Sequence, residues 1–541
     1  MHFLSQLICY KNVKYNVTCL TLPIHYIMKK KILLLNILLL CSVCGYSNNL
    51  RITNVSATAT TIQFDIAWDN SWNTAAPTNN WDAVWIFVKT QVCAVGSSPW
   101  LHANVSTVSA NHTVTGGVLQ VDAVTDGRGV FIRRIATGSG NIATATVVLT
   151  FSSAYTVAST NYEVLGIEMV NVPQGSFQVG DISLNGTTHS VNSFGSFLST
   201  ATTTIGSEAL IAAGSPLRNQ SSEQSFPYAN HQQLVTAYPK GFNAFYCMKY
   251  EISQQQYVAF LNLLTFEQQS YRTAIIPSAT IGTAALATAS GDNRNSIEIR
   301  TPGIAFSTPA VYGNDLNNNN TYDEANDGGN IACNYLSWRD LKAYLDWSAL
   351  RPMTELEFEK AARGANIPVL QEYAWGATTI TQAISSALTN GGQASEVSTT
   401  TGNGLCAQNG GISTTLGPLR VGFAATGATI RAGAGASFYG IMDLSGNLWE
   451  QAITVGWNTG PPSTTGPGNI IIFVGGNGDG IIDNLGDSNT AGWGISDAQS
   501  IVRGGNWEYT AQRCQVSDRF YLGNTAENAT RTRRTGGRGV R

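Results

Sequence analysis

Residues 350–364 read LRPMTELEFEKAARG, and they carry the clearest helix start in this sequence. Thr354 and Glu357 have the spacing of a capping box, in which a hydroxyl and a carboxylate satisfy free amides of the first helical turn. We therefore predict a helix that begins at Thr354. Its inward face would carry Phe358, Ala361 and Ala362.

Two more helices are predicted upstream of this stretch. Residues 253–264 and 340–347 both repeat apolar side chains at helical spacing. From residue 376 to 436 the chain is rich in Thr, Gly and Ala, which predicts long surface loops or insertions. The apolar faces of the two helices would carry Tyr257, Phe260, Leu261 and Leu264 in the first and Leu341, Tyr344, Leu345 and Trp347 in the second.

The N-terminal part follows a period of two instead. Between residues 49 and 155, short segments of alternating apolar and polar side chains are separated by clusters of Gly, Ser, Asn and Thr. Several short strands of this kind favour an antiparallel β-sandwich, a type of domain that serves as a spacer or adhesion module. The alternating segments include Ile62, Phe64, Ile66 and Trp68, and comparable strands at residues 84–89, 130–135 and 143–151.

Composition narrows the classes of function. Of 541 residues, 43% are hydrophobic and only 12% are charged, with a formal net charge of -3. Such a chain has no basic field to hold phosphates, so nucleic acid is not an expected partner. The length predicts two or three domains.

The start of the sequence has the pattern of a secretory signal. Lys29, Lys30 and Lys31 precede an apolar run over residues 32–40 that is too short to span a membrane. We therefore predict no stable transmembrane helix in the mature chain. The predicted organisation is an upstream extension at residues 1–27, a signal peptide at 28–47, a β-sandwich domain at 48–160 and a second domain at 161–541.

The spacing of the cysteines predicts no disulfide pattern and no zinc site. Nine cysteines are present, and four of them lie in or before the predicted signal. The remaining five are far apart in sequence, so neither a disulfide pattern nor a Cys-rich zinc site is predicted. The five are Cys93, Cys247, Cys333, Cys406 and Cys514.

The second domain resembles the formylglycine-generating enzyme, or sulfatase-modifying factor, family. The resemblance follows six blocks in order, including YGIMDLSGNLWE at 439–450 and RGGNW at 503–507. It implies an α+β, C-type-lectin-like fold with little regular secondary structure, here preceded by an all-β sandwich domain. The blocks lie at residues 167–177, 245–262, 336–364, 373–376, 439–450 and 503–507.

The resemblance also implies a copper site, because oxidases of this family bind copper(I) between two cysteines that follow a Gly-Gly pair. Copper(I) is soft and prefers thiolates. The ninth residue after Gly505 is Cys514, which matches the second cysteine and is our candidate catalytic residue, but the fourth is Tyr509. A phenol cannot replace a thiolate, so a copper site would need Cys247, Cys333 or Cys406 to approach from elsewhere.

Three further features depart from catalytic members of the family. Asn506 stands where the family has a serine, and Gly537-Arg538 replaces its closing Gly-Phe-Arg. Iron-dependent members need several histidines, whereas this domain has only His189 and His231, which are far apart. An iron centre is therefore not expected.

A structural calcium site is implied in the block at 439–450. The family holds calcium with side-chain oxygens at the first and last positions and with carbonyls between them, which transfers to Asp443, Gly446, Leu448 and Glu450. A conventional turn is the alternative. Two other loops, residues 315–324 and 477–483, have alternating oxygen donors but lack the full calcium pattern, and Asn- and Asp-rich turns explain them equally well.

Two groups of charged residues receive different predictions. The group around the helix that starts at Thr354 is predicted to form structural ion pairs. The second group lies closest to the expected groove and would contact a peptide or anionic partner. The first group is Arg351, Glu357, Glu359 and Arg363, and the second is Arg503, Arg513 and Arg519.

The leading hypothesis is an exported bacterial protein, secreted, periplasmic or at the cell surface, whose second domain is catalytically degenerate and acts as a binding or structural envelope component. Its partner would be a protein or peptide, for example a sulfatase. The alternative is a copper-dependent formylglycine-generating oxidase acting on a cysteine of a client sulfatase. A second thiol near Cys514 would favour the oxidase, and a filled apolar groove would favour the binding component. Glycan binding through Trp68, Trp72, Trp81 and Trp85 is a third hypothesis.

Overall fold

The computed structural model describes nine segments of the chain. The predicted upstream extension and signal peptide lie outside them. Residues from Tyr46 onward form one compact unit. Within the described segments, no helix has the length and apolar character needed to cross a membrane. The segments are residues 49–93, 98–181, 202–212, 217, 234–426, 429–455, 473–493, 500–521 and 530–541.

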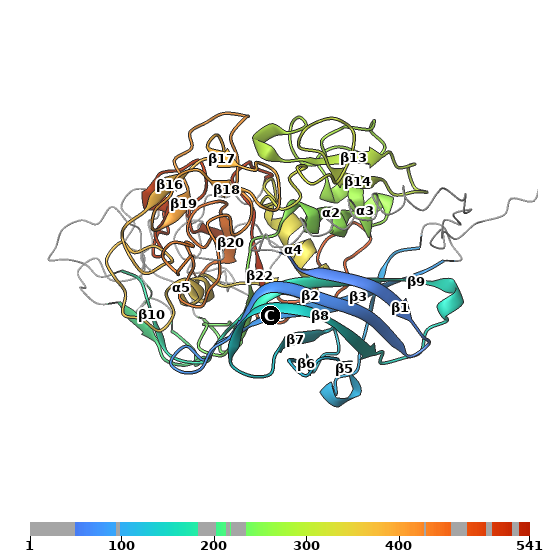
Figure 1. Cartoon of the computed structure of the whole chain (residues 1–541), viewed down its shortest axis with the longest axis horizontal. Helices are drawn as coiled ribbons and strands as arrows, with labels where there is room; N and C mark the ends of the chain where they lie inside the picture. Colours follow the sequence, from blue (N-terminus) through green and yellow to red (C-terminus); the bar gives the residue numbers. More distant parts are fainter. Residues whose placement is uncertain are drawn as a thin grey trace, which may run out of the picture. The chain divides into compact units, whose positions relative to one another are not determined.

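Two β-sheets are stacked in the N-terminal part, and Figure 1 shows β1, β2 and β8 laid over β3 and β9. The first sheet has the order β1(Arg51–Ala57), β2(Thr61–Asn73), β8(Gly138–Thr150) and β5(Thr113–Val114). The second has the order β15(Arg351–Pro352), β22(Gly539–Val540), β12(Phe245–Met248), β9(Thr160–Val172), β3(Asp82–Val92), β7(Val130–Arg134) and β6(Leu119–Ala123), and β4(Leu101–Ala103) pairs with β3.

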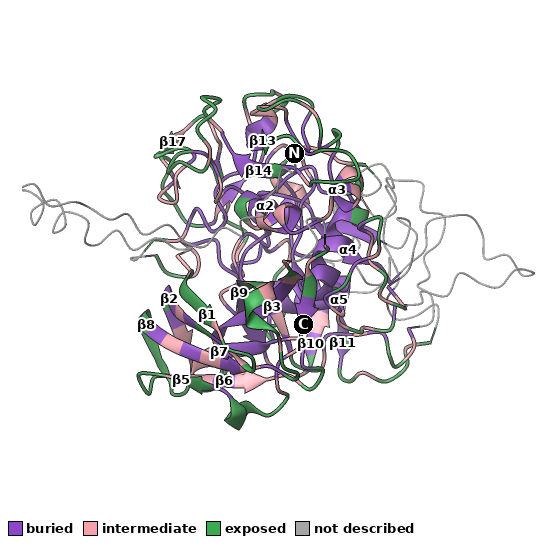
Figure 2. Ribbon diagram, turned by 90° about the vertical axis from the view of Figure 1, so that its right-hand side faces the viewer, coloured by how far each residue is buried: buried purple, intermediate pink, exposed green. Residues whose placement is uncertain are grey.

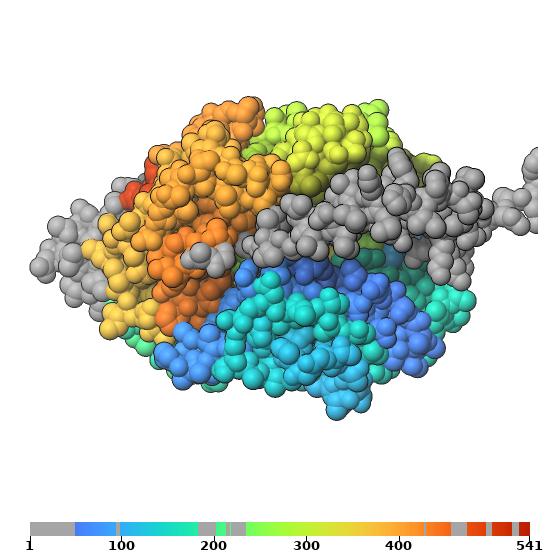
Figure 3. All heavy atoms as spheres, viewed as in Figure 1, coloured from blue at the N-terminus to red at the C-terminus, as the bar shows by residue number. Residues whose placement is uncertain are grey.

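The predicted alternation produces the core between these sheets. Phe64 and Trp68 of β2 are fully buried, as are Val84 and Ile86 of β3, and all four belong to one apolar cluster. Figure 2 shows the resulting change of burial from residue to residue along β2 and β8. In Figure 3 these strands, blue to teal, gather on one side of the visible face. The predicted strands are confirmed.

One strand joins the two parts of the chain. Residues 160–170 of β9 pair with β3, and residues 169–172 pair with β12. The second sheet therefore continues across the predicted boundary at residue 160. A separate sandwich domain that precedes the C-terminal domain is not confirmed, and the domain boundaries stay a prediction.

Capping boxes start all four α-helices in the described residues. Ser253, Thr265, Ser337 and Thr354 each accept a hydrogen bond from the third residue of the following helix. The three predicted helices are confirmed, and one more follows Thr265. The helices are α2(Gln254–Asn262), α3(Phe266–Arg272), α4(Trp338–Trp347) and α5(Glu355–Arg363), and short 3-10 turns are η1(Ser109–Asn111), η2(Val157–Ser159), η3(Asp292–Arg294) and η5(Ala511–Cys514).

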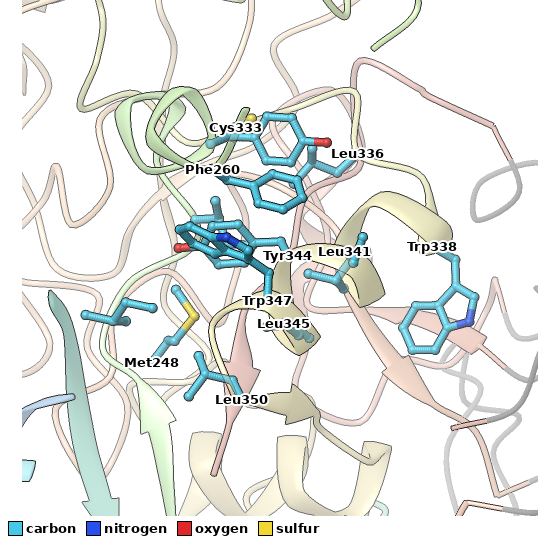
Figure 4. Packing of buried hydrophobic residues seen from close by; sticks show 14 of the residues in the cluster. Met248, Phe260, Cys333, Leu336, Trp338, Leu341, Tyr344, Leu345, Trp347 and Leu350 are labelled. Carbon is cyan, nitrogen blue, oxygen red and sulfur yellow. The ribbon is translucent and has the colours of Figure 1, made fainter. Parts of the chain in front are cut away.

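The main core of the C-terminal part forms around α4. Figure 4 shows Tyr344 and Trp347 of this helix packed beside Phe260 of α2. The ring centroids of Phe260 and Trp347 are 5.1 Å apart in an edge-on arrangement. Aromatic packing of this kind lets a few short helices close a large core.

The remaining strands form small two-stranded sheets, of which one lies between α3 and α4, one precedes α2 and three follow α5. Part of region 376–436 is irregular but buried rather than on the surface: Leu419, Val421 and Phe423 belong to an apolar cluster. The prediction of surface loops is wrong for this part. The pairs are β10(Phe177–Val179) with β11(Thr203–Ile205), β13(Ile297–Thr301) with β14(Val311–Asn314), β16(Thr381–Ala383) with β19(Leu405–Ala407), β17(Leu388–Thr389) with β18(Val397–Ser398), and β20(Glu450–Ile453) with β21(Ser500–Arg503).

The combination of mixed sheets with few helices confirms the α+β class. The C-type-lectin-like arrangement stays a prediction.

Candidate functional site

The predicted cysteine lies directly against the Gly-Gly pair. Gly504 and Gly505 follow β21 with φ angles of 81° and 79°, a region that favours glycine. A Cβ on Gly505 would lie 2.5 Å from Sγ of Cys514, so only glycine lets η5 approach so closely. The backbone thus fixes the Cys514 thiol in place.

A second thiol, that of Cys406 on β19, reaches this position. Cys406 and Cys514 belong to the same buried apolar cluster. Ser445 lies between their backbones: its carbonyl accepts from the Cys406 thiol at 3.1 Å, and its hydroxyl donates to the Cys514 carbonyl at 2.7 Å. A Cβ on Gly446 would lie 2.3 Å from Sγ of Cys406, so each thiol rests on a glycine.

This pair of thiols, the Cys406–Cys514 site, is closed off from solvent. Cys406 and Cys514 are 1% and 0% exposed, and they share an apolar cluster with Tyr373 and Trp375. The two aromatic rings stack with centroids 5.0 Å apart. Burial, and then the hydrogen bond with Cys514, raises the pKa of the Cys406 thiol well above its usual value. Cys406 is therefore a protonated thiol at neutral pH.

Tyr509, at the position of the first family cysteine, belongs to another cluster. Its ring lies 6.0 Å from that of Trp449 and 5.3 Å from that of Tyr521. The guanidinium of Arg534 lies 5.3 Å from the Tyr509 ring. The phenol therefore fills an aromatic cluster and supplies no thiolate.

A comparison with known families agrees with this geometry. Residues 156–541 match the family model described as the sulfatase-modifying factor enzyme 1-like domain. The chain belongs to the formylglycine-generating enzyme family. A search of curated proteins gave no match.

Copper(I) is the metal that this family implies, and Cys406 with Cys514 would hold it. Two adjacent thiols suit a soft monovalent ion, which would supply oxygen activation when bound. Their full burial and the raised pKa of Cys406 oppose it, because metal binding needs thiolates and an approach path.

The other departures from the family pattern have structural roles. Asn506 is fully buried, and its Oδ1 accepts from the backbone amides of Glu508 and Tyr509 at 2.9 and 3.1 Å. Arg538 is fully buried and forms an ion pair with Glu450. His189 and His231 lie outside the described residues, so the expectation of no iron centre stays a prediction.

The predicted calcium block carries more negative than positive partners. Asp443 accepts from the amide of Gly422 at 2.5 Å, and Glu450 pairs with Arg538 through Oε1. Oε2 of Glu450 is buried without a hydrogen-bond partner. Burial, and then the charge of Asp443, raises the pKa of the neighbouring Glu251 well above its usual value. A cation would relieve this crowding, and the calcium site itself stays a prediction.

No set of three His, Cys, Asp or Glu side chains with metal-site geometry exists in the part of the chain that the structure describes. The predicted calcium site uses two carboxylates and two carbonyls, so that finding does not test it.

The two weaker acidic loops are held by turns. In the first loop, Oδ1 of Asn317 accepts from the amide of Asn319 at 3.1 Å, and Oδ1 of Asn319 accepts from the amide of Thr321 at 2.6 Å. Asp479 accepts from the amide of Ile481 at 2.8 Å. These bonds are typical of Asx turns and explain the oxygen spacing without a metal.

The first group of charged residues forms ion pairs as predicted. Arg351 pairs with Glu357 at 2.6 Å, and Arg363 pairs with Glu359 at 3.0 Å. All four side chains are at most 8% exposed.

The prediction that the second group contacts a partner is wrong, because these arginines form ion pairs within the protein. Arg503 and Arg519 are 0% and 1% exposed, and both bind Glu355, at 3.0 and 2.7 Å. Arg513 pairs with Asp518 at 3.1 Å, and its guanidinium lies 3.4 Å from the ring centroid of Phe520. Large buried networks of this kind hold a fold that has little regular hydrogen bonding.

Sequence reasoning did not choose Cys406 from the three candidate cysteines. The short segment Leu405-Cys406-Ala407 is the signal that was available: an apolar triplet inside a Gly- and Thr-rich region. It forms β19, which pairs in parallel with β16 and places Cys406 opposite Gln382.

Proposed function

We propose that this protein is a non-catalytic member of the formylglycine-generating enzyme family, exported by a bacterium and acting as a binding or structural component of the envelope. The observation that carries the proposal is the burial of the Cys406–Cys514 site beneath Tyr373 and Trp375. An oxidase must bring a substrate cysteine to its metal, and a thiol that is 0% exposed offers no such approach.

One observation favours the oxidase instead. Cys406 lies in the same cluster as Cys514 and would supply the second thiol that Tyr509 cannot. If Tyr373 and Trp375 moved aside, the two thiols would have the donor set for copper(I). The oxidase therefore remains the alternative, and activity decides between the two.

The deciding experiment incubates the reduced full chain with copper(I), oxygen and a peptide that contains Cys-x-Pro-x-Arg. Mass spectrometry then follows conversion of the peptide cysteine to an aldehyde. We expect no conversion. Conversion that is lost in Cys514→Ser and in Cys406→Ser, but kept in Cys247→Ser, would establish the oxidase. Cys247 is the matched control because its thiol is also fully buried and lies in a different cluster.

A binding role is supported by an apolar hollow far from the thiols in sequence. This hollow, of about 450 Å³, is lined by Trp100, Leu264, Phe266 and Phe306 among others. Phe306 is 88% exposed, an unusual position for a large apolar side chain. Such a surface suits an apolar side chain of a protein or peptide partner.

Export is supported by the signal-peptide pattern at residues 28–47. N-terminal sequencing of the protein from a bacterial host tests it. A mature chain that begins near Asn48 is the expected result, and a chain that keeps Met1 would contradict it.

Calcium at Asp443, Gly446, Leu448 and Glu450 is supported by the unpartnered Oε2 of Glu450. Removal of calcium with a chelator should lower Tm of the wild type, and Asp443→Ala should abolish that response. Asp323→Ala, in the acidic loop at 315–324, is the control that keeps it. A wild-type Tm that does not respond to chelation would argue against the site.

A further inference from the structure

The Cys406–Cys514 site contains two thiols from distant parts of the sequence. Among the described residues these two cysteines share a cluster with each other, whereas Cys247 and Cys333 lie in two different clusters. The fold therefore brings Cys406 to Cys514 specifically and keeps Cys247 and Cys333 in other clusters.

The surroundings hold both sulfur atoms in place. Each thiol rests on a glycine that has no room for a Cβ, Gly446 under Cys406 and Gly505 under Cys514. Both cysteines are tied to the segment at 445–447, because Ser445 bonds to the Cys406 thiol and to the Cys514 carbonyl and the Asn447 amide donates to the Ala407 carbonyl at 2.9 Å. Two thiols that are buried in one cluster and bonded through the same serine are placed to meet, and a disulfide between them would have a length of ~2 Å.

Neither thiol forms a strong interaction in the reduced protein. Cys406 donates to the carbonyl of Ser445, a weak hydrogen bond for a thiol, and both sulfurs are buried. In a reducing compartment such a pair remains two inert thiols. Outside the cytoplasm, thiols that meet during folding are oxidised.

We infer that Cys406 and Cys514 form a disulfide, which fastens β19 to η5 and withdraws the family's cysteine from chemistry. Two S–H bonds break and one S–S bond forms. The two electrons and two protons pass to a small disulfide such as oxidised glutathione, which becomes two thiols. The exchange occurs while the chain folds, because the finished structure admits no oxidant to the site.

This inference rests on the proposed function and gives a physical reason for it. A cysteine held in a disulfide is not a thiolate, so Cys514 cannot bind copper while the bond is intact. The two ideas fail separately: peptide oxidation by the reduced chain would refute the non-catalytic proposal and leave the disulfide unaffected.

The test uses the full chain refolded in a buffer of oxidised and reduced glutathione. Remaining thiols are alkylated in denaturant without reductant, and the chain is digested with trypsin. Cleavage after Arg513 and Arg519 releases residues 514–519, and cleavage after Arg363 and Arg420 releases residues 364–420. Each peptide contains one cysteine, so a cross-link between them identifies the bond.

The expected result is a cross-linked pair of these peptides that separates on reduction. The peptides that carry Cys247 and Cys333 should be fully alkylated, because these cysteines are equally buried but lie apart from both thiols. The Cys406→Ser variant should leave Cys514 alkylated, and Cys247→Ser should keep the cross-link.

Two results would overturn the inference. One is full alkylation of Cys406 and Cys514 in the wild type. The other is a cross-link from either residue to a different cysteine. Because the wild type itself gives the decisive result, a variant that fails to fold does not weaken the test.

Discussion

Two buried regions meet at the end of β21 and solve burial in opposite ways. The first is the α5 ion-pair network, in which two carboxylates of α5 pair with an arginine of the same helix and with two arginines that flank Cys514 in sequence. Its members are Glu355, Glu359, Arg363, Arg503 and Arg519. The second is the Cys406–Cys514 site, which begins after Gly505 and contains uncharged, weakly bonding groups.

The difference teaches which part of this fold can change. In the network every carboxylate has a guanidinium partner, and removal of either leaves a buried charge. At the thiol site a side chain can be exchanged without leaving a charge behind. A cysteine of this site can therefore be replaced by another small uncharged residue with little effect on the fold.

The Glu355→Gln substitution should have the largest effect and tests whether the ion-pair network is the less tolerant of the two regions. Burial alone would raise the pKa of Glu355, but Arg519 and Arg503 more than offset this and lower it. The substitution leaves both guanidiniums buried without that charge, and we expect a loss of about 3–5 kcal/mol in the free energy of unfolding. Urea denaturation measures it. Glu163→Gln, on an exposed part of β9, is the control; a similarly small effect at Glu355 would show that the network is not essential.

Reduction of the inferred disulfide should have the next largest effect. The bond closes a loop of roughly 100 residues, so its loss should lower the free energy of unfolding by about 2–4 kcal/mol. Thermal unfolding with and without a reductant measures it. Cys406→Ser should remove the response to reductant; a response that persists in this variant would place the sensitive bond elsewhere.

Glu298 tests what happens to a buried carboxylate outside the network. It is 2% exposed on β13, and its Oε1 has no hydrogen-bond partner. Burial is the main cause that raises its pKa to about 7; a hydrogen bond with Ser290 opposes this shift, and the charges of Asp315 and Asp327 add to it. The folded state therefore binds a proton between pH ~4 and ~7 that the unfolded state releases, and stability falls as pH rises through this window.

The Glu298→Gln variant should accordingly be more stable than the wild type at pH 8, by about 2 kcal/mol, and equal to it at pH 4. Chemical denaturation at the two pH values measures both differences. A gain of equal size at pH 4 would point to packing and not to ionisation.

The smallest expected effect is at the N-cap of α5, where it tests whether the ion-pair network depends on the start of the helix. Thr354 caps α5 beside the network, and its hydroxyl also donates to the Pro239 carbonyl at 3.0 Å. Thr354→Ala should cost about 1–2 kcal/mol. Thr265→Ala, at the matching cap of α3 away from the network, should cost about 1 kcal/mol or less. Equal values would mean that the network does not depend on the cap.

Local patterns predicted the elements that local forces decide. The capping box at Thr354 and the alternation through Phe64 and Trp68 depend on neighbours in sequence, and both are confirmed. The ion pairs around α5 were also predictable, because a buried helix with this many charges needs partners.

The candidate site depended on contacts that no local pattern contains. Cys406 reaches Cys514 only through the parallel pairing of β19 with β16 and through the absence of a side chain at Gly446. The sequence alone predicts Arg503 and Arg519 at a groove, but Glu355, which lies far from them in sequence, forms ion pairs with both. Long-range burial, and not residue type, decided these roles.

The central sheet has a consequence for how the protein folds. Its order places β22, at residues 539–540, beside β12, and through β9 it connects these late residues to β3 at residues 82–92. Pairings between such distant segments close large loops before they gain contacts, which makes folding slow. The edge of β9 therefore stays open to pairing with other chains until β12 joins it, and the edge of β12 stays open until β22 arrives from the end of the sheet's sequence.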